Sequence, residues 1–169
     1  MFVDSDFAPD YGPALLGPDF AKYHSTSGWV ACVGGQPVAW RSRRQSLFAD
    51  STCVAEYLAA AEAAKAAVAL RLYLADAGYV QPDPTVVHED NTGCIKLSRS
   101  LCDHDRTKHV DHRAHQLREF YARELVVLKH IPTDQQWANV LTKNCPGPEL
   151  RRFRRAVMSG SVFAPLAAS

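Results

Sequence analysis

Three acidic residues stand at points in the sequence from which their side chains could meet. Asp90 ends a short apolar run that turns at once into a helical pattern, and Asp4 follows the opening apolar residues. Glu56 lies in the first turns of the longest helical pattern of the chain. Reactive groups of an α/β sheet gather at the carboxyl ends of its strands, where loops leave a crevice. Because clustered carboxylate oxygens are ligands that Mg²⁺ prefers, the three acids are a candidate metal site.

Each of these acids also has an ordinary structural interpretation. An aspartate after a strand commonly caps the helix or turn that follows, which would account for Asp4 and Asp90. Glu56 could be a solvent-exposed acid on a helix surface. Three acids from three separate elements are more than capping requires, but the residue types alone leave both interpretations open.

A sheet with helices packed on it must position these acids. Apolar alternation and turn signals predict strands over residues 1–6, 27–33, 36–42, 84–90 and 124–131, with Gly34 and Gly35 as a hairpin turn. Three antiparallel strands come first, and the last two strands are reached through helices. This order predicts an α/β fold, with a mixed five-stranded sheet and helices on both faces.

Apolar residues spaced by three and four predict the helices. The longest is capped by Asp50 or Ser51 and ends at Gly78. Its predicted inner stripe comprises Tyr57, Ala61, Ala64, Val68 and Leu72. Further helices are predicted over 92–97, 109–123, 132–144 and 149–158, with a basic polar loop over 98–108.

The composition limits the class of protein. The 169 residues suit one domain, and 47% apolar and 22% charged residues are the ordinary globular balance. The sequence has no apolar run long enough to span a membrane and no signal-peptide pattern. Five cysteines without a CxxC pair favour a reducing compartment over a disulfide framework. A net charge of +1 does not by itself indicate nucleic-acid binding. A strand that begins at the first residues suggests a piece of a longer polypeptide.

Six short segments carry a family resemblance. They are VDSDFA (3–8), STSGW (25–29) running to WRS (40–42), AEYLA (55–59), EDNTG (89–93), RTKHVD (106–111), and IPTD (131–134) running to LTK (141–143). In this order they resemble the ribonuclease H domain at the end of the Pol polyprotein of copia-type LTR retrotransposons. The resemblance covers roughly residues 2–145. It divides the chain into a ribonuclease H domain over 1–145 and a basic, partly frayed C-terminal extension over 146–169.

The resemblance implies a ribonuclease H-like fold and a metal-dependent endonuclease. Such an enzyme would hydrolyse the RNA strand of RNA–DNA hybrids during reverse transcription, using two Mg²⁺ ions for which Mn²⁺ can substitute. Asp4 would be the ligand shared by both ions, and Glu56 and Asp90 would complete the second ion's site. The polymerase part of the same polyprotein is the implied partner. The implied location is intracellular, in a cytoplasmic virus-like particle or the nucleus.

The fourth acid of the family pattern falls on position 139, where this sequence has Asn. Asn139 keeps one oxygen that can contact a metal but lacks the negative charge. The resemblance therefore leaves an alternative, a weakened or inactive domain that binds hybrid or serves a structural role. The amide could be natural or the result of a deliberate substitution. A related nuclease or strand-transfer enzyme acting on DNA is a further alternative, which the family segment 106–111 disfavours.

Substrate contacts are predicted from local charge and position. Basic residues around the third helix could follow a phosphate backbone, or could form a solvated helix face: Lys96, Arg99, Arg106, Lys108, Arg113 and Arg118. Polar residues beside the proposed site could read the 2′-hydroxyl groups of RNA: Ser5, Asn91, Thr92 and Gln135.

A group of metal-binding residue types overlaps the basic segment. It consists of Cys102, His104, His109, His112 and His115. Their spacing matches no standard zinc finger, and the resemblance already accounts for part of the segment. Zinc binding is therefore the less favoured interpretation.

Overall fold

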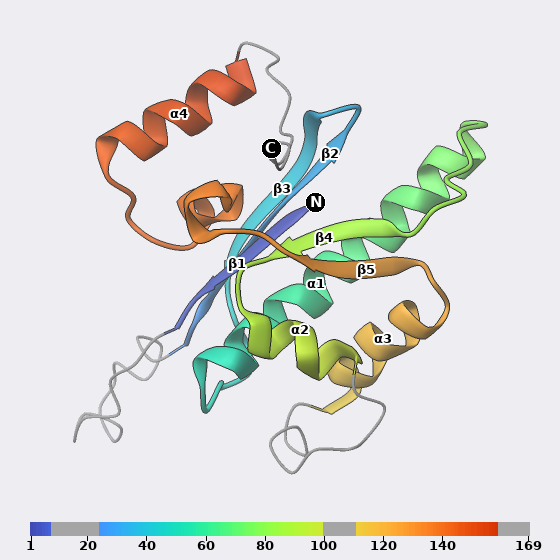
Figure 1. Cartoon of the computed structure of the whole chain (residues 1–169), viewed down its shortest axis with the longest axis horizontal. Helices are drawn as coiled ribbons and strands as arrows, with labels where there is room; N and C mark the ends of the chain where they lie inside the picture. Colours follow the sequence, from blue (N-terminus) through green and yellow to red (C-terminus); the bar gives the residue numbers. More distant parts are fainter. Residues whose placement is uncertain (8–23, 100–110, 159–169) are drawn as a thin grey trace.

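The computed structural model describes residues 1–7, 24–99 and 111–158, with the side chains of 111–114 outside that description. Five strands form one sheet in the order β3-β2-β1-β4-β5 (Figure 1). Their bounds are Phe2–Asp6 for β1, Thr26–Val33 for β2, Gln36–Arg44 for β3, Thr85–Glu89 for β4 and Val126–His130 for β5. β1, β2 and β3 pair antiparallel, whereas β4 lies parallel to both β1 and β5. The predicted mixed five-stranded sheet is confirmed.

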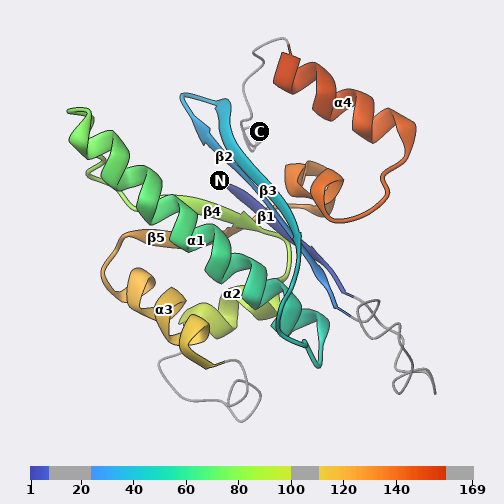
Figure 2. The same ribbon diagram turned by 180° about the vertical axis from the view of Figure 1, so that it is seen from behind.

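Helices cover the two faces of this sheet (Figures 1 and 2). One face carries α1 (Thr52–Asp76), α2 (Thr92–Arg99) and α3 (Asp111–Ala122). The other face carries the short 3₁₀ helix η5 (Trp137–Leu141), against which α4 (Gly147–Met158) packs. Within the described residues, no helix is both long and apolar enough to cross a membrane.

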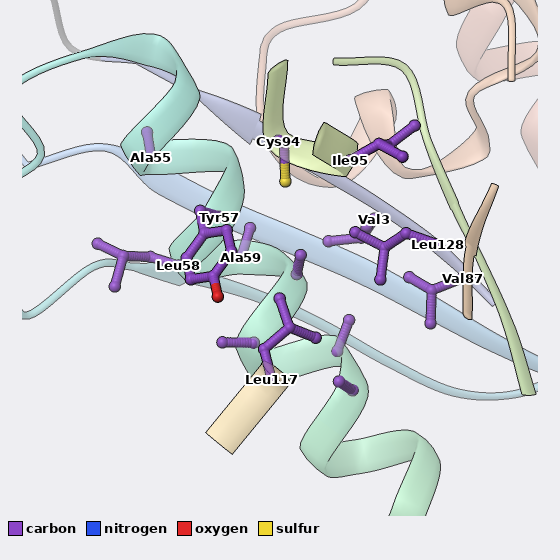
Figure 3. Packing of buried hydrophobic residues seen from close by; sticks show 14 of the residues in the cluster. Val3, Ala55, Tyr57, Leu58, Ala59, Val87, Cys94, Ile95, Leu117 and Leu128 are labelled. Atoms are coloured by element: carbon purple, nitrogen blue, oxygen red, sulfur yellow. The ribbon is translucent and has the colours of Figure 1, made fainter. Parts of the chain in front are cut away.

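The alternation of side chains along β1 divides the hydrophobic core into two clusters. Val3 points to the helical face and joins the larger cluster, whose members include Tyr57, Val87, Leu117 and Leu128 (Figure 3). Phe2 points the other way and joins the smaller cluster of Val30, Ile131, Ala138 and Ala156. β1 is therefore buried on both faces, which makes it a rigid support for Asp4.

α1 follows the sequence pattern only in its first half. Ser51 caps the helix, accepting a hydrogen bond from the Val54 N–H. Of the predicted inner stripe, Tyr57 is fully buried, but Leu72 is 63% exposed. The prediction for Leu72 was wrong because the last turns of α1 project beyond β4 and β5 (Figure 2).

The predicted helix over 132–144 was also wrong. The segment forms two short 3₁₀ helices, η4 (Thr133–Gln135) and η5, separated by an extended residue, Gln136. The Gln136 side-chain amide donates hydrogen bonds to the carbonyl oxygens of Val3 (2.8 Å) and His88 (3.2 Å). These contacts with β1 and β4 hold the residue out of a helical conformation.

Candidate active site

Asp4, Glu56 and Asp90 lie together at one end of the sheet. One carboxylate oxygen from each lies within 4.8 Å of the others. Asp4 and Glu56 are buried and Asp90 is half-buried, so the group opens to solvent on the Asp90 side. The structure thus brings together the three acids that the sequence singled out.

Strand register explains this convergence. Phe2 of β1 lies opposite His88 of the parallel strand β4. Asp4 and Asp90 are each two residues further along, so the two strands deliver them to the same level. Glu56 comes from the first turns of α1, where small neighbours such as Ala55 and Ala59 are fully buried and let the helix lie close to the sheet.

Asp4 receives two further contacts, both from the segment after η5. The Thr142 hydroxyl donates a hydrogen bond to Asp4 Oδ2, and Lys143 Nζ lies 3.9 Å from the same oxygen. Burial raises the pKa of Asp4 to about 6, although the Thr142 hydrogen bond and the charge of Lys143 act in the opposite direction. The nearby charge of Asp90 adds to the rise.

A fourth acid, Glu89, lies fully buried beside the group. Its Oε1 accepts a hydrogen bond from the Asn91 N–H at 3.0 Å, which fixes the turn that carries Asp90. Burial raises the pKa of Glu56, and the charge of Glu89 raises it further. Glu56 Oε2 and Glu89 Oε2 are both buried without a hydrogen-bond partner among the described residues.

Asn139 lies buried in η5, on the face of the sheet that Asp4 also occupies. Its side-chain Nδ2 donates to the Thr133 carbonyl at 3.1 Å, which leaves Oδ1 buried and without a partner in the described part of the chain. The Thr142 hydroxyl that contacts Asp4 also lies 3.1 Å from the Asn139 carbonyl oxygen. Thr142 therefore ties the backbone of η5 directly to Asp4.

The donors of this site fit a hard divalent cation. Three carboxylates supply oxygen ligands, and Glu56 Oε2 is a buried oxygen whose hydrogen-bonding capacity is unused within the described residues. Mg²⁺ and Mn²⁺ take oxygen ligands of this kind and can keep bound waters besides.

The predicted substrate-contacting residues are only partly described. Asn91 Oδ1 accepts a hydrogen bond from the Cys94 N–H at 3.0 Å and thus caps α2, with Thr92 exposed beside it. Ser5 is buried, with 6% of its surface exposed. Arg106 and Lys108 lie outside the described residues, as does the side chain of Arg113. Most of the predicted loop over 98–108 lies outside them too.

The structure also bears on two other predicted features, the basic residue Arg118 and the proposed zinc group. Arg118 is buried against the Tyr57 hydroxyl, so it belongs neither to a phosphate-binding row nor to a solvated face. Of the proposed zinc group, the side chain of His115 is described and is exposed. Cys102, His104 and His109 lie outside the described residues, and so does the side chain of His112.

Sequence reasoning assigned no role to Glu89, Thr142 or Lys143. Glu89 could have been found from strand alternation, because it points to the same side of β4 as the buried Val87. Thr142 and Lys143 stand within a family segment, but the helix predicted over 132–144 gave no reason to place them beside Asp4.

The sequence of this chain is similar to regions of known Pol polyproteins. The chain is 35% identical over 136 residues to the retrovirus-related Pol polyprotein from transposon TNT 1-94 of Nicotiana tabacum, a match covering 80% of the chain and 10% of that polyprotein. It is 27% and 29% identical to the Pol polyproteins from transposons RE2 and RE1 of Arabidopsis thaliana, over 87% and 79% of its length. The chain thus spans about a tenth of the curated relatives it matches. No family model matches it.

Among solved structures, the chain resembles RNase H1 from the halophilic archaeon Halobacterium salinarum NRC-1. The TM-score is 0.51 at 20% identity, and the match covers 83% of this chain and 91% of the other. At this level of identity, the likeness concerns the fold alone.

Proposed function

This chain is homologous to one region of the copia-type Pol polyproteins and has a ribonuclease H-like fold, and on that premise we propose that it is a metal-dependent endonuclease. Its substrate would be the RNA strand of RNA–DNA hybrids formed during reverse transcription. The convergence of Asp4, Glu56 and Asp90 carries the proposal, since phosphodiester hydrolysis of this type needs clustered carboxylates.

The proposed cofactor is a pair of Mg²⁺ ions, for which Mn²⁺ can substitute. Asp4 would be the shared ligand, Glu56 and Asp90 would complete the second ion's site, and Asn139 would offer an uncharged amide oxygen. Ions held there would supply an activated water and a polarised phosphate. Thr142 keeps one Asp4 oxygen oriented, and Glu89 holds the turn that presents Asp90.

The substrate would lie across the open side of this group. Asn91 and Thr92 follow Asp90 directly and are the proposed contacts with the RNA strand. Arg106, Lys108 and Arg113 are proposed to follow the phosphates. The proposed partner is the polymerase part of the same polyprotein, and the proposed location is a cytoplasmic virus-like particle or the nucleus. The proposed catalytic unit is 1–145, with 146–169 as an extension whose α4 packs on η5.

A second candidate follows from Asn139 alone. Without the fourth carboxylate, the domain could bind hybrid with little or no cleavage.

A cleavage assay separates the two candidates. End-labelled RNA–DNA hybrid is incubated with Mg²⁺ or Mn²⁺, beside duplex DNA and single-stranded RNA as control substrates. We expect cleavage of the hybrid RNA strand only, leaving 5′-phosphate and 3′-hydroxyl ends. Equal cutting of duplex DNA would contradict the proposed substrate. Hybrid binding without cleavage in either metal would support the second candidate.

A further inference from the structure

Lys143 places a positive charge beside the cluster of Asp4, Glu56 and Asp90. Its Nζ lies 3.9 Å from Asp4 Oδ2, and its side chain is 40% exposed whereas that of Asp4 is 3% exposed. The ammonium group therefore lies beside the buried carboxylate, on a side chain that solvent reaches. Its charge acts on Glu56 as well as on Asp4.

The backbone that carries Lys143 is held firmly. The Lys143 N–H donates to the Asn139 carbonyl at 3.2 Å, and the neighbouring Thr142 hydroxyl contacts both that carbonyl and Asp4. The Lys143 side chain is held less tightly, because 3.9 Å exceeds the length of a hydrogen bond. Its base is thus fixed beside the site while its ammonium group can move.

A phosphate entering the site offers this ammonium group a better partner than Asp4 does. Asp4 Oδ2 already accepts a hydrogen bond from the Thr142 hydroxyl. In the proposed function the Asp4 carboxylate would also bind metal. The oxygens of a phosphodiester would approach from solvent, to which the Lys143 side chain is 40% exposed. A lysine ammonium has three donors and commonly contacts phosphate as a point charge.

We propose that Lys143 is a catalytic residue whose ammonium group moves from Asp4 to a non-bridging oxygen of the scissile phosphate. This inference rests on the proposed function. During hydrolysis a water oxygen bonds to phosphorus, the bond from phosphorus to the 3′ oxygen breaks, and the water's proton leaves to solvent while the 3′ oxygen takes one up. Lys143 keeps its proton throughout. It offsets the negative charge that the phosphorus centre gains as the water attacks.

The charge count explains why this site needs such a group. In the proposed complex, three carboxylates and one diester balance the charge of two divalent ions. Attack by a deprotonated water adds one negative charge to the reacting centre. Lys143 supplies one positive charge from a group that is already in place, so no solvent must reorganise to stabilise the transition state.

The proposal predicts two opposite effects of removing the charge. In the free protein Lys143 repels incoming cations, so Lys143→Met is expected to bind Mn²⁺ about 2- to 5-fold more tightly. At saturating metal the same variant should cleave hybrid about 10- to 100-fold more slowly, because a hydrogen bond to a charged group is lost in the transition state. A residue that only supported the fold would not strengthen metal binding while slowing cleavage.

The test measures Mn²⁺ binding without substrate by electron paramagnetic resonance, and single-turnover cleavage of hybrid at saturating Mn²⁺. Lys143→Arg keeps the charge and should stay closer to wild type in both measurements. Lys65→Met removes an exposed lysine from α1 and is the matched control, with neither value changed. Thermal unfolding confirms that each variant folds.

Three outcomes would overturn the proposal. If Lys143→Met cleaves at the wild-type rate at saturating metal, Lys143 does not contact the reacting phosphate, although the proposed nuclease function stands. If Lys143→Met cleaves slowly but binds Mn²⁺ no more tightly than wild type does, the residue is structural. If the wild-type protein fails to cleave hybrid with either Mg²⁺ or Mn²⁺, the proposed function fails, and a catalytic role for Lys143 fails with it.

Discussion

Asp4 illustrates the conflict between folding and metal binding at the scale of one residue. It is 2% exposed, and burial raises the pKa of its carboxyl group from the ordinary 3.8 to about 6. The hydrogen bond from Thr142 and the charge of Lys143 offset only part of this cost. A divalent ion would offset the remainder, so the features that strain the metal-free site suit it for binding a cation.

The free energy of unfolding should therefore depend on pH when metal is chelated. The folded state holds the Asp4 proton more tightly than the unfolded chain does, so stability falls as pH rises from 3.8 to about 6. The loss should approach about 3 kcal/mol, since each unit of pKa shift is worth about 1.4 kcal/mol. The raised pKa of Glu56 extends the loss to higher pH. Urea unfolding in chelator across this range measures it, and stability that rises with pH would contradict the assignment.

Asp4→Asn should separate activity from stability. Cleavage should fall by roughly 10³-fold or more, because the shared ligand is lost together with several kcal/mol of transition-state stabilisation. The fold should persist, and in chelator the variant should be at least as stable as wild type at pH 7, since a buried charge is removed. Cleavage assays and urea unfolding check both expectations. Wild-type cleavage by this variant would place the active site elsewhere.

Asn139→Asp should restore a fourth carboxylate. The added charge should lower the Mg²⁺ concentration needed for half-maximal cleavage and raise the rate, by about tenfold if it contributes about 1.4 kcal/mol. A Mg²⁺ titration of cleavage by both forms measures this. Asn144→Asp, the same chemical change at an exposed position nearby, is the control. An unchanged titration would mean that position 139 is not a metal ligand.

At the scale of elements, the close contact between β2 and η5 decides where Asn139 and Thr142 lie. Gly28 of β2 pairs with Asp4, and a Cβ atom added there would lie 2.6 Å from Thr142 Cγ2 and 2.8 Å from Leu141 Cβ. The absence of a side chain at this one strand position lets the η5 segment reach Asp4.

Gly28→Ala should consequently disturb the site as well as the fold. The added methyl group must push η5 away, which should cost about 1–3 kcal/mol of stability, as overpacking usually does. Cleavage should fall as Thr142 loses contact with Asp4. The control is Gly147→Ala, where the nearest atom is the flexible end of Arg151 at 3.1 Å. Urea unfolding and cleavage assays measure both variants, and a Gly28→Ala protein with wild-type stability would show that the contact is not tight.

At the scale of the whole molecule, charge is distributed unevenly although the net charge is only +1. The carboxylate group would repel a nucleic acid unless cations neutralise it, so binding depends on basic residues elsewhere on the surface. The segment that includes Arg106 and Lys108 is proposed to supply these basic residues.

Hybrid affinity should accordingly fall steeply with salt. Each phosphate contact contributes up to about 0.9 to the slope of log affinity against log salt, so replacing Arg106 and Lys108 by Ala should flatten the slope by up to about 2. Binding in Ca²⁺ over a salt series measures the slope. Replacing Lys65 and Lys129 by Ala removes the same net charge and serves as the control. An equal slope for wild type and the Arg106/Lys108 variant would mean that those residues form a solvated surface and do not contact phosphates.

Local sequence patterns were sufficient for most elements of this fold. Period-two alternation marked the strands, Gly34-Gly35 marked the hairpin, and both glycines adopt the positive φ that such a turn requires. The acids were identified because Asp4 follows the opening apolar residues, Asp90 ends an apolar run and Glu56 lies in the first turns of a helical pattern. A few neighbouring residues determine each of these features.

Tertiary structure decided which side chains meet and what surrounds them. The exposure of Leu72 depends on where α1 ends relative to the sheet. The 3₁₀ form of η5 depends on the hydrogen bonds from Gln136 to β1 and β4. The contacts of Thr142 and Lys143 with Asp4 join residues more than a hundred positions apart. Periodicity extends over a few turns or one strand, so it carries no information about such distant contacts. Strand register and the space above Gly28 determine them.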